Sequence, residues 1–409
     1  MCSTFRPALL FVPLFLTVPC AAQLSITWQH LADLPYAVQS PYMFAVDGRI
    51  FVGDGITEHP PLALAGGMHE YLPATDTWVT RTPCPGPDRY GARGFSLNGL
   101  GYITCGWANN SPVIQINDTW AYEPSSDTWT PKAPFPGGER YTAISCATST
   151  KGYTGLGFSP YYDDWWEYDP AADQWTQRAS FPGGARQSAI SFVIDEQVYV
   201  GCGASSNTNF LSDLWRYDPQ SDTWTPRAGL PTSRYASYAF TYAQQGFVVC
   251  GLALDPNNNP TTMAEVWTYE PATDSWTQLA DFPGTPRGDG ASCSAGGMGY
   301  LGFGRYTFGQ VPLSANMTSE FWRIRQAETG IGEAGADPLL HVRTAEGTML
   351  ITQSGATPLD ITITDATGRL VGSGTVPPKG TLSVRMDDQS PGTYFVRPAT
   401  GAAQRVMVR

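Results

Sequence analysis

The residues best suited to recognition chemistry in this 409-residue chain are arginines that recur at long, regular intervals. Each follows a proline-containing turn by three or four residues and opens a segment of small residues. They are Arg89, Arg140, Arg186, Arg234 and Arg287, and Gln39 takes the place in the first interval. A planar guanidinium presents its donors in a fork that matches a carboxylate. If the segments converge on one rim, these arginines would form a ring that binds anions or hydroxyl groups.

A structural role for the same arginines competes with that interpretation. A residue that recurs in nearly every repeat often serves the repeat itself, by bonding carbonyl groups or a nearby carboxylate of its own loop. The sequence leaves both roles open. If the arginines are structural, the ligand is expected on the variable loops Gly106–Ile116 and Leu252–Ala264.

Motifs for catalysis or metal binding are scarce. The chain has four histidines, His30, His59, His69 and His341, and it contains no Gly-x-Ser-x-Gly elbow or His-Glu-x-x-His motif. Carboxylates are abundant, but their positions do not single out a catalytic pair. The sequence therefore predicts no catalytic residues, metal site or cofactor, and it favours a protein that is not an enzyme.

Six cysteines follow the N-terminal segment, namely Cys84, Cys105, Cys146, Cys202, Cys250 and Cys293. Cys105 and Cys250 occupy equivalent places in their intervals, and so do Cys146 and Cys293. Two equivalent disulfides between intervals are therefore conceivable in an exported chain. The favoured interpretation is that these cysteines are buried thiols that act as small apolar residues.

Composition excludes one large class of partner. Charged residues make up 15% of the chain, and the formal net charge is −12. Such a chain is poorly suited to bind nucleic acid through phosphate neutralisation. Plentiful glycine, proline and aromatic residues, without a long amphipathic helical pattern, indicate an all-β protein with many tight turns.

A strand–turn–strand repeat determines where these residues lie. The pattern Tyr-x-Pro-x-x-Asp-x-Trp begins at Tyr71, Tyr122, Tyr168, Tyr217 and Tyr269. A further tryptophan precedes four of these tyrosines by two residues, at Trp120, Trp166, Trp215 and Trp267, and His69 takes its place in the first repeat. Proline sets φ for the turn, and the aspartate can accept bonds from nearby backbone N–H groups.

The last tryptophan of the pattern defines a period near 50 residues. It occurs at Trp28, Trp78, Trp129, Trp175, Trp224 and Trp276, in steps of 46 to 52 residues. We interpret these tryptophans as structural residues that pack each repeat against its neighbour. A period of this length with several strands is typical of a β-propeller.

The repeat count predicts a closed ring. Trp28 lies on a lone predicted strand, Ile26 to His30, and the last repeat ends on a third strand, Glu320 to Ile324, with no fourth strand after it. The N-terminal strand can complete that blade and remove an exposed edge. The prediction is a six-bladed propeller over residues 23–325, closed by its N-terminal strand.

The repeated residues resemble the kelch motif over roughly residues 24–325. Gly-x-Gly or Cys-Gly replaces the usual glycine pair, a form similar to the kelch proteins of Gram-negative bacteria. The resemblance implies that the innermost strands surround a channel, and some kelch propellers bind acidic ligands through arginines at this strand entry. Others carry a copper-radical oxidase, but its paired histidines, tyrosine and cross-linked cysteine have no matching set here.

The N-terminus carries a targeting feature. Arg6, the apolar run Ala8–Leu16 and the small residues Cys20-Ala21-Ala22 predict a signal peptide over residues 1–22. A lipoprotein attached through Cys20 is the alternative, which the preceding proline disfavours. Elsewhere no apolar run is long enough to span a membrane.

The C-terminal part has a different character. Residues 326–338 are small, polar and glycine-rich, which is typical of a flexible linker. Short alternating strands then predict a small β-sandwich over residues 339–409. The predicted strands are 341–343, 348–352, 359–365, 381–385, 394–397 and 405–409. Its segments Ile361–Arg369, Pro391–Arg397 and Gln404–Arg409 resemble the type A C-terminal sorting domain of the type IX secretion system. The resemblance implies export by the outer-membrane machinery of a Gram-negative bacterium. A generic immunoglobulin-like adhesive module is the alternative.

Two classes of function follow from these observations. The favoured one is a secreted or cell-surface, non-catalytic module that binds an extracellular glycan or protein. The other is a sugar-active enzyme such as a mutarotase or epimerase, which pairs of carboxylate and arginine facing the channel would favour. The sequence does not identify the ligand, and it leaves open whether the protein is released or stays attached to the cell.

Overall fold

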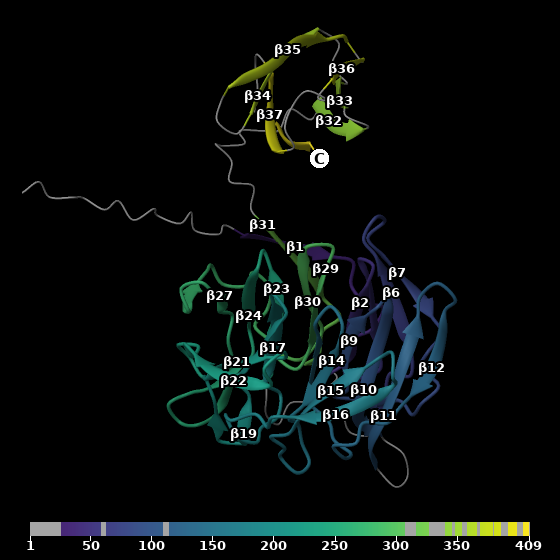
Figure 1. Cartoon of the computed structure of the whole chain (residues 1–409), viewed down its shortest axis with the longest axis vertical. Helices are drawn as coiled ribbons and strands as arrows, with labels where there is room; N and C mark the ends of the chain where they lie inside the picture. Colours follow the sequence, from purple (N-terminus) through teal and green to yellow (C-terminus); the bar gives the residue numbers. More distant parts are fainter. Residues whose placement is uncertain are drawn as a thin grey trace, which may run out of the picture. The chain divides into compact units, whose positions relative to one another are not determined.

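The computed structural model describes residues 26–58, 63–108, 114–306 and 316–326, and most of the chain from residue 340 to 408 in short stretches. Those stretches are 340–345, 348–353, 358–365, 369–378, 380–385, 392–398 and 404–408. The described residues form strands and turns, and no helix among them could cross a membrane. The chain divides into two compact units, Thr27–Arg325 and one that contains Gln326–Arg409 (Figure 1). The predicted signal peptide, and the predicted linker after Gln326, lie outside the described residues.

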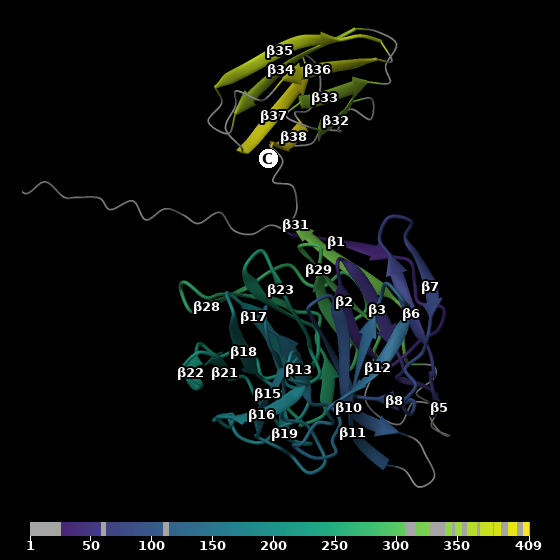
Figure 2. The same cartoon turned by 45° about the vertical axis from the view of Figure 1, so that its right-hand side comes forward.

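The first unit is a six-bladed β-propeller, in which each blade is an antiparallel sheet. Five blades each come from one stretch of the chain, and the sixth also includes the N-terminal strand β1, beside β31 in Figures 1 and 2. From the axis outward, blade 1 contains β2 (Tyr42–Val46), β3 (Arg49–Gly53), β6 (Met68–Leu72) and β7 (Thr77–Arg81). Blade 2 contains β9 (Arg93–Leu97), β10 (Leu100–Ala108), β11 (Ile114–Glu123) and β12 (Thr128–Lys132), and the short β8 (Arg89–Tyr90) also pairs with β10. Blade 3 contains β13 (Ile144–Ala147), β14 (Gly152–Gly155), β15 (Trp165–Asp169) and β16 (Gln174–Arg178). Blade 4 contains β17 (Ile190–Ile194), β18 (Gln197–Gly201), β21 (Leu214–Asp218) and β22 (Thr223–Arg227). Blade 5 contains β23 (Tyr238–Tyr242), β24 (Gln245–Val249), β27 (Val266–Glu270) and β28 (Ser275–Gln278). Blade 6 contains β29 (Ala291–Ala295), β30 (Met298–Gly302), β31 (Phe321–Gln326) and β1 (Ile26–Leu31). The loops between the second and third strands of blades 1, 4 and 5 carry small hairpins, β4 (Ile56–Glu58) with β5 (Ala63–Leu64), β19 (Ala204–Ser206) with β20 (Asn209–Phe210), and β25 (Leu252–Leu254) with β26 (Pro260–Thr262).

The ring closes as the sequence predicts. Strand β1 pairs with β31 and supplies the outermost strand of blade 6. A set of six backbone hydrogen bonds near the axis joins each blade to the next, with N···O distances of 2.7 to 3.3 Å. These bonds form an unbroken circle through Ser40, Gly91, Thr142, Ser188, Ala236 and Asp289. All of these residues have positive φ, between 46° and 67°, which turns the chain into the innermost strand.

Neighbouring blades pack through side chains of complementary size. In four interfaces a phenylalanine on the innermost strand lies on a glycine of the next blade; the pairs are Phe44–Gly101, Phe95–Gly152, Phe192–Gly246 and Phe240–Gly299. A Cβ on Gly101 would lie 2.1 Å from the Phe44 ring, so glycine is required by this close approach. In the other two interfaces the smaller Cys146 and Cys293 pack in the same clusters as Val198 and Ile50.

The cysteines are accounted for by this packing. All six are free thiols. Burial raises the pKa of Cys105, Cys202 and Cys250 to about 12, so these thiols stay protonated and unreactive. The interpretation as small apolar residues therefore fits the structure better than the two disulfide bridges do.

The Asp-x-Trp turn fastens each blade to the one before it. In blade 3 the Trp175 indole donates to the Ala133 carbonyl (3.0 Å), while Asp173 accepts from the Ala133 N–H (2.9 Å) and from the Tyr168 hydroxyl (2.6 Å). The same bonds recur at Trp78, Trp129, Trp224 and Trp276. Trp28 differs, because Ile26 stands where the aspartate would be and its indole nitrogen is buried without a partner among the described residues.

The C-terminal unit is a two-sheet sandwich, as predicted (Figure 2). One sheet has the order β32 (Leu340–Ala345), β33 (Thr348–Gln353), β36 (Thr381–Arg385), and the other β35 (Leu370–Val376), β34 (Leu359–Asp365), β37 (Gly392–Pro398), β38 (Gln404–Val408). Met349 and Ile351 from the first sheet pack with Ile361, Ile363 and Val396 from the second. This small core belongs to the unit itself.

Candidate ligand-binding site

The five predicted arginines lie inside the blades. Their side chains are 0–1% exposed. Arg140 shows the arrangement: its Nη1 donates to the Leu156 carbonyl (2.9 Å) and to Asp164 Oδ1 (2.5 Å), and its Nη2 donates to Asp164 Oδ2 (2.9 Å). The guanidinium also stacks on Tyr162, 3.6 Å from the ring centroid. Its donors are therefore directed at the blade itself.

Each of these arginines belongs to a three-residue set with an acid and a tryptophan. The acid stands two residues before the first tryptophan of the repeat, and the indole donates to it; Trp166 donates to Asp164 at 2.8 Å. The ion pairs are Arg89–Asp118, Arg140–Asp164, Arg186–Asp213, Arg234–Glu265 and Arg287–Glu320. Although burial alone would raise the pKa of Glu265, hydrogen bonds from Trp267 and Arg234 lower it. This geometry favours the structural role, while ligand binding by the arginines stays a prediction.

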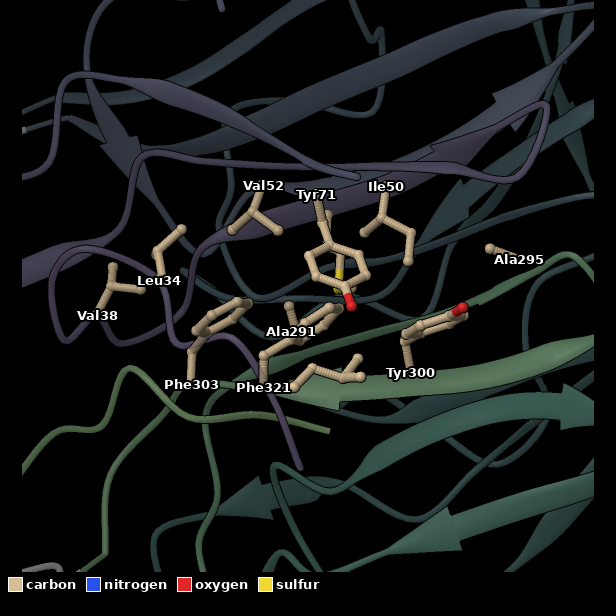
Figure 3. Close-up of a cluster of buried hydrophobic side chains, with 12 residues drawn as sticks. Leu34, Val38, Ile50, Val52, Tyr71, Ala291, Ala295, Tyr300, Phe303 and Phe321 are labelled. Atoms are coloured by element: carbon tan, nitrogen blue, oxygen red, sulfur yellow. The ribbon is translucent and has the colours of Figure 1, made fainter. Parts of the chain in front are cut away.

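The first blade corrects one assignment. Val38, not Gln39, occupies the position of the arginines, because Gly304 N–H donates to the Val38 carbonyl as Gly157 N–H donates to that of Arg186. Gln39 lies one residue later, where Gln187 lies in blade 4. Figure 3 shows Val38 in an apolar cluster with Leu34 and Phe303.

The other two members of the set are also replaced in blade 1. Gly67 stands for the acid and His69 for the tryptophan. Burial lowers the pKa of His69, whose Nδ1 lies 3.5 Å from the Tyr36 hydroxyl. The arginine, acid and tryptophan are therefore lost together, as expected for residues that function as one unit.

The residue after each arginine position forms a second ring, at one mouth of the central channel. This mouth ring comprises Gln39, Tyr90, Tyr141, Gln187, Tyr235 and Gly288. Each member pairs with the segment that leaves the second strand of its blade. The mouth is therefore bordered by the loops between second and third strands, which differ most in sequence from blade to blade.

Aromatic side chains are continuous along one side of this mouth. Ring centroids lie 4.8 Å apart for Trp107 and Tyr90, 5.7 Å for Tyr90 and Tyr141, 5.6 Å for Tyr141 and Phe158, and 4.8 Å for Phe158 and Tyr161. All five are partly exposed. We call them the aromatic arc. Burial raises the pKa of Tyr90 and Tyr141, so both hydroxyls stay protonated and can donate hydrogen bonds.

A carboxylate–arginine pair lies on the other side of the mouth. Asp289 Oδ2 accepts from Arg305 Nε (3.1 Å) and lies 3.0 Å from Arg305 Nη2. The same oxygen accepts from Gln39 Nε2 at 3.2 Å. Asp289 is 7% exposed, and Arg305 is 20% exposed. Arg305 is therefore the more exposed member of the pair.

Below the mouth, the innermost strands enclose a channel of about 420 Å³. Its walls are mostly small side chains from all six blades, including Ser145, Ser191 and Ser292. Arg93 and Glu196 are the charged residues among the described residues that line it. No cluster of three or more histidine, cysteine or acidic side chains suited to a metal ion occurs within the described residues.

Comparison with known proteins supports the repeat. Residues 192–231, which run from β17 into the turn after β22, match the model of the kelch motif. The chain is a six-bladed propeller that carries a kelch motif. Among solved structures, that of YjhT is similar, with a TM-score of 0.60 and 13% identity over 71% of this chain and 96% of that one. This likeness shows the fold alone. No curated protein sequence matches the chain.

Most residues of the mouth were missed by the sequence prediction. Trp107 lies near the end of β10, within the variable segment Gly106–Ile116 that the sequence offered as the alternative ligand site. Tyrosine follows the repeat arginine in three blades of this propeller, a signal that could have identified Tyr90 and Tyr141. Asp289 and Arg93 occur once each at their positions, so the repeat gave no indication of them.

Proposed function

We propose that the chain is an exported, non-catalytic binding module and that a carbohydrate binds at the mouth of its channel. The aromatic arc carries this proposal. A sugar ring has an apolar face of C–H groups that packs on aromatic rings, and such rings provide large contact area at small entropic cost. Hydroxyl groups around the sugar then need polar partners, which Gln187, Tyr141 and Arg305 offer at the mouth.

A glycan fits these features better than a folded protein does. A channel of about 420 Å³ suits a group of sugar size, within the range common for small-ligand pockets. A stable protein partner requires roughly 800 Å² of contact surface on each side. The partly exposed aromatic residues are concentrated around a concave mouth, which favours a compact ligand that enters it.

Removal of one ring from the arc should weaken binding strongly. The mature chain would first be tested on a glycan array, and the strongest ligand would then be titrated by calorimetry. We expect Trp107→Ala to raise its dissociation constant about tenfold or more, because stacking and apolar contact are lost together.

Trp107→Phe is the matched control and should retain most of the affinity, because it keeps an aromatic face. A Trp107→Ala variant with wild-type affinity and an unchanged unfolding midpoint would show that the arc is not the binding surface.

A sugar-active enzyme is the second candidate, and the Asp289–Arg305 pair favours it. Acid–base chemistry needs a carboxylate free to exchange a proton with the substrate. Asp289 Oδ2 is instead occupied by donors from Arg305 and Gln39, which favours binding over catalysis. Anomerisation of a freshly dissolved sugar, followed by NMR with and without the protein, distinguishes the two functions.

The export part of the proposal rests on the two ends of the chain. The C-terminal sandwich has its own core, as a sorting domain that acts separately from its cargo requires. In the native host, mass spectrometry of the exported protein should find an N-terminus near Gln23 and loss of much of the chain after Pro338. Deletion of residues 339–409 should leave the propeller in the periplasm. Normal export of the truncated chain would contradict the sorting role.

A further inference from the structure

Arg93 breaks the pattern of the innermost strands. It stands four residues after Arg89, at the start of β9. The equivalent residues of the other blades are buried and uncharged; they are Tyr42, Ile144, Ile190, Tyr238 and Ala291. Arg93 is only partly buried, and it lines the channel. A single arginine at a position that otherwise packs two blades together is not needed by the repeat.

Among the described residues, the Arg93 guanidinium has no partner. Arg89, Arg140 and the other repeat arginines are each bonded to a carboxylate and to carbonyl groups. The Arg93 backbone belongs to the β9–β10 ladder, but no hydrogen bond or ion pair involves its side chain within the part of the chain that the structure describes. Loss of water in the channel lowers the pKa of Arg93, while the nearby Asp289 and Tyr235 act in the opposite direction. A cation that has lost water without gaining a partner is an incomplete site.

The surrounding charges leave Arg93 uncompensated. Asp289 is the nearest described acid in electrostatic terms, but Arg305 pairs with it at 3.0 Å. Glu196, the other charged residue lining the channel, lies in the turn between β17 and β18, at the opposite end of the innermost strands from Arg93. It accepts from the backbone N–H and the hydroxyl of Ser149 at 2.9 Å each. Arg93, Arg305 and Asp289 together therefore give the mouth one net positive charge, although the whole chain carries a net charge of −12. The local charge dominates at short range, because water and salt screen the more distant charges of the chain.

We propose that Arg93 is an anion subsite that binds the carboxylate of a ligand entering from the mouth. The inference rests on the proposed function, and it narrows the ligand to a carbohydrate that carries a carboxylate, such as a uronic acid. A carboxylate is a planar monoanion that matches both the fork of one guanidinium and the single net charge. The serine hydroxyls of the channel wall can donate further bonds to it.

The test uses two ligands that differ only at C6 of each sugar unit. Galacturonate oligomers carry a carboxylate where the corresponding galactose oligomers carry a hydroxymethyl group. We expect the mature wild-type chain to bind trigalacturonate at least about tenfold more tightly than galactotriose, since charge-assisted bonds are stronger than neutral ones. Arg93→Met should abolish this preference while changing the affinity for galactotriose less than about twofold. Arg227→Met, on the outermost strand β22, removes the same charge far from the channel and should retain the preference.

A second measurement observes Arg93 itself. The Nε–Hε signal of Arg93 in a ¹⁵N–¹H spectrum can be assigned by its loss in Arg93→Lys. Galacturonate should shift this signal to saturation, whereas galactose should leave it unmoved. An equal response to acetate would show that any small carboxylate is bound, so the sugar part of the assignment would be wrong.

The outcomes separate this proposal from the proposed function. Binding of both oligomers with equal affinity would overturn the anion subsite and leave the carbohydrate module intact. A saturable shift of the Arg93 signal by galacturonate, without binding of any neutral glycan, would support the subsite and overturn the role of the aromatic arc. Preference for trigalacturonate that survives Arg93→Met would place the anion elsewhere.

Discussion

Arg140→Met should lower the free energy of unfolding of the propeller by about 3–5 kcal/mol, the usual effect of removing one partner of a buried ion pair. Asp164, 15% exposed, would lose both guanidinium bonds, and the Leu156 carbonyl would lose its donor. The stacking of the guanidinium on Tyr162 would also be lost. Guanidinium chloride unfolding followed by tryptophan fluorescence measures the change. This signal reports the propeller alone, because residues 339–409 contain no tryptophan.

A double variant is the control for this result. In Arg140→Met with Asp164→Leu no charge is left unpaired, so much of the lost stability should return. Blade 1 is a natural precedent, since Val38 and Gly67 replace both members of the pair. The affinity of Arg140→Met for the strongest glycan ligand should stay within about twofold of wild type. Lost binding with an unchanged unfolding midpoint would restore the five arginines as the ligand site.

Trp175→Ala should cost about 3 kcal/mol, at the lower end of the range for large-to-small changes, because the side chain is half-buried. The variant loses the edge contact with Phe135, whose ring centroid is 5.1 Å away, and the bond to the Ala133 carbonyl. Both contacts join blade 3 to the chain that enters it from blade 2. The whole ring should therefore unfold at a lower denaturant concentration, in one transition.

The unpartnered Trp28 provides a matched control. Trp175→Phe keeps an aromatic ring but loses the indole donor, so it should cost about 1 kcal/mol. Trp28→Phe should have almost no effect, because the Trp28 indole nitrogen has no hydrogen-bond partner in the described parts of the chain. Equal effects of the two substitutions would mean that the indole bond contributes nothing to the joint between blades.

The architecture was predictable because it depends on features that recur. The tryptophan period gave the number of blades, and the unpaired predicted strands at Ile26–His30 and Glu320–Ile324 gave the closure; the structure places β1 and β31 there. One strand of the sandwich was missed, β35 (Leu370–Val376). Its glycines have low strand propensity, yet a Cβ on Gly374 would lie 2.7 Å from Leu382 across the core. Tertiary packing, which is invisible in local sequence, decides that strand.

The role of the arginines could not be read from recurrence alone. Recurrence places Arg140 at the start of a strand, but it does not show whether the side chain turns into the blade. That direction depends on Leu156 and Gly157, whose positive φ values direct the Leu156 carbonyl toward the Arg140 guanidinium. The error at Gln39 has a simpler cause. Val38 follows the proline of its turn by three residues, as Arg234 does. The sequence prediction instead placed the arginine position four residues after the proline, as at Arg140, and so chose Gln39.

Hydrogen–deuterium exchange of the mature chain, with and without the strongest glycan ligand, tests the central claim most directly. The claim is that recurring residues build the ring and that residues unique to single blades bind the ligand. Ligand should slow exchange at the entries of the innermost strands, around Tyr90 and Tyr141, and in the loop that carries Trp107. It should leave the Asp-x-Trp turns unchanged, since they lie within the joints between blades. Protection confined to those turns, with none at the mouth, would contradict the account.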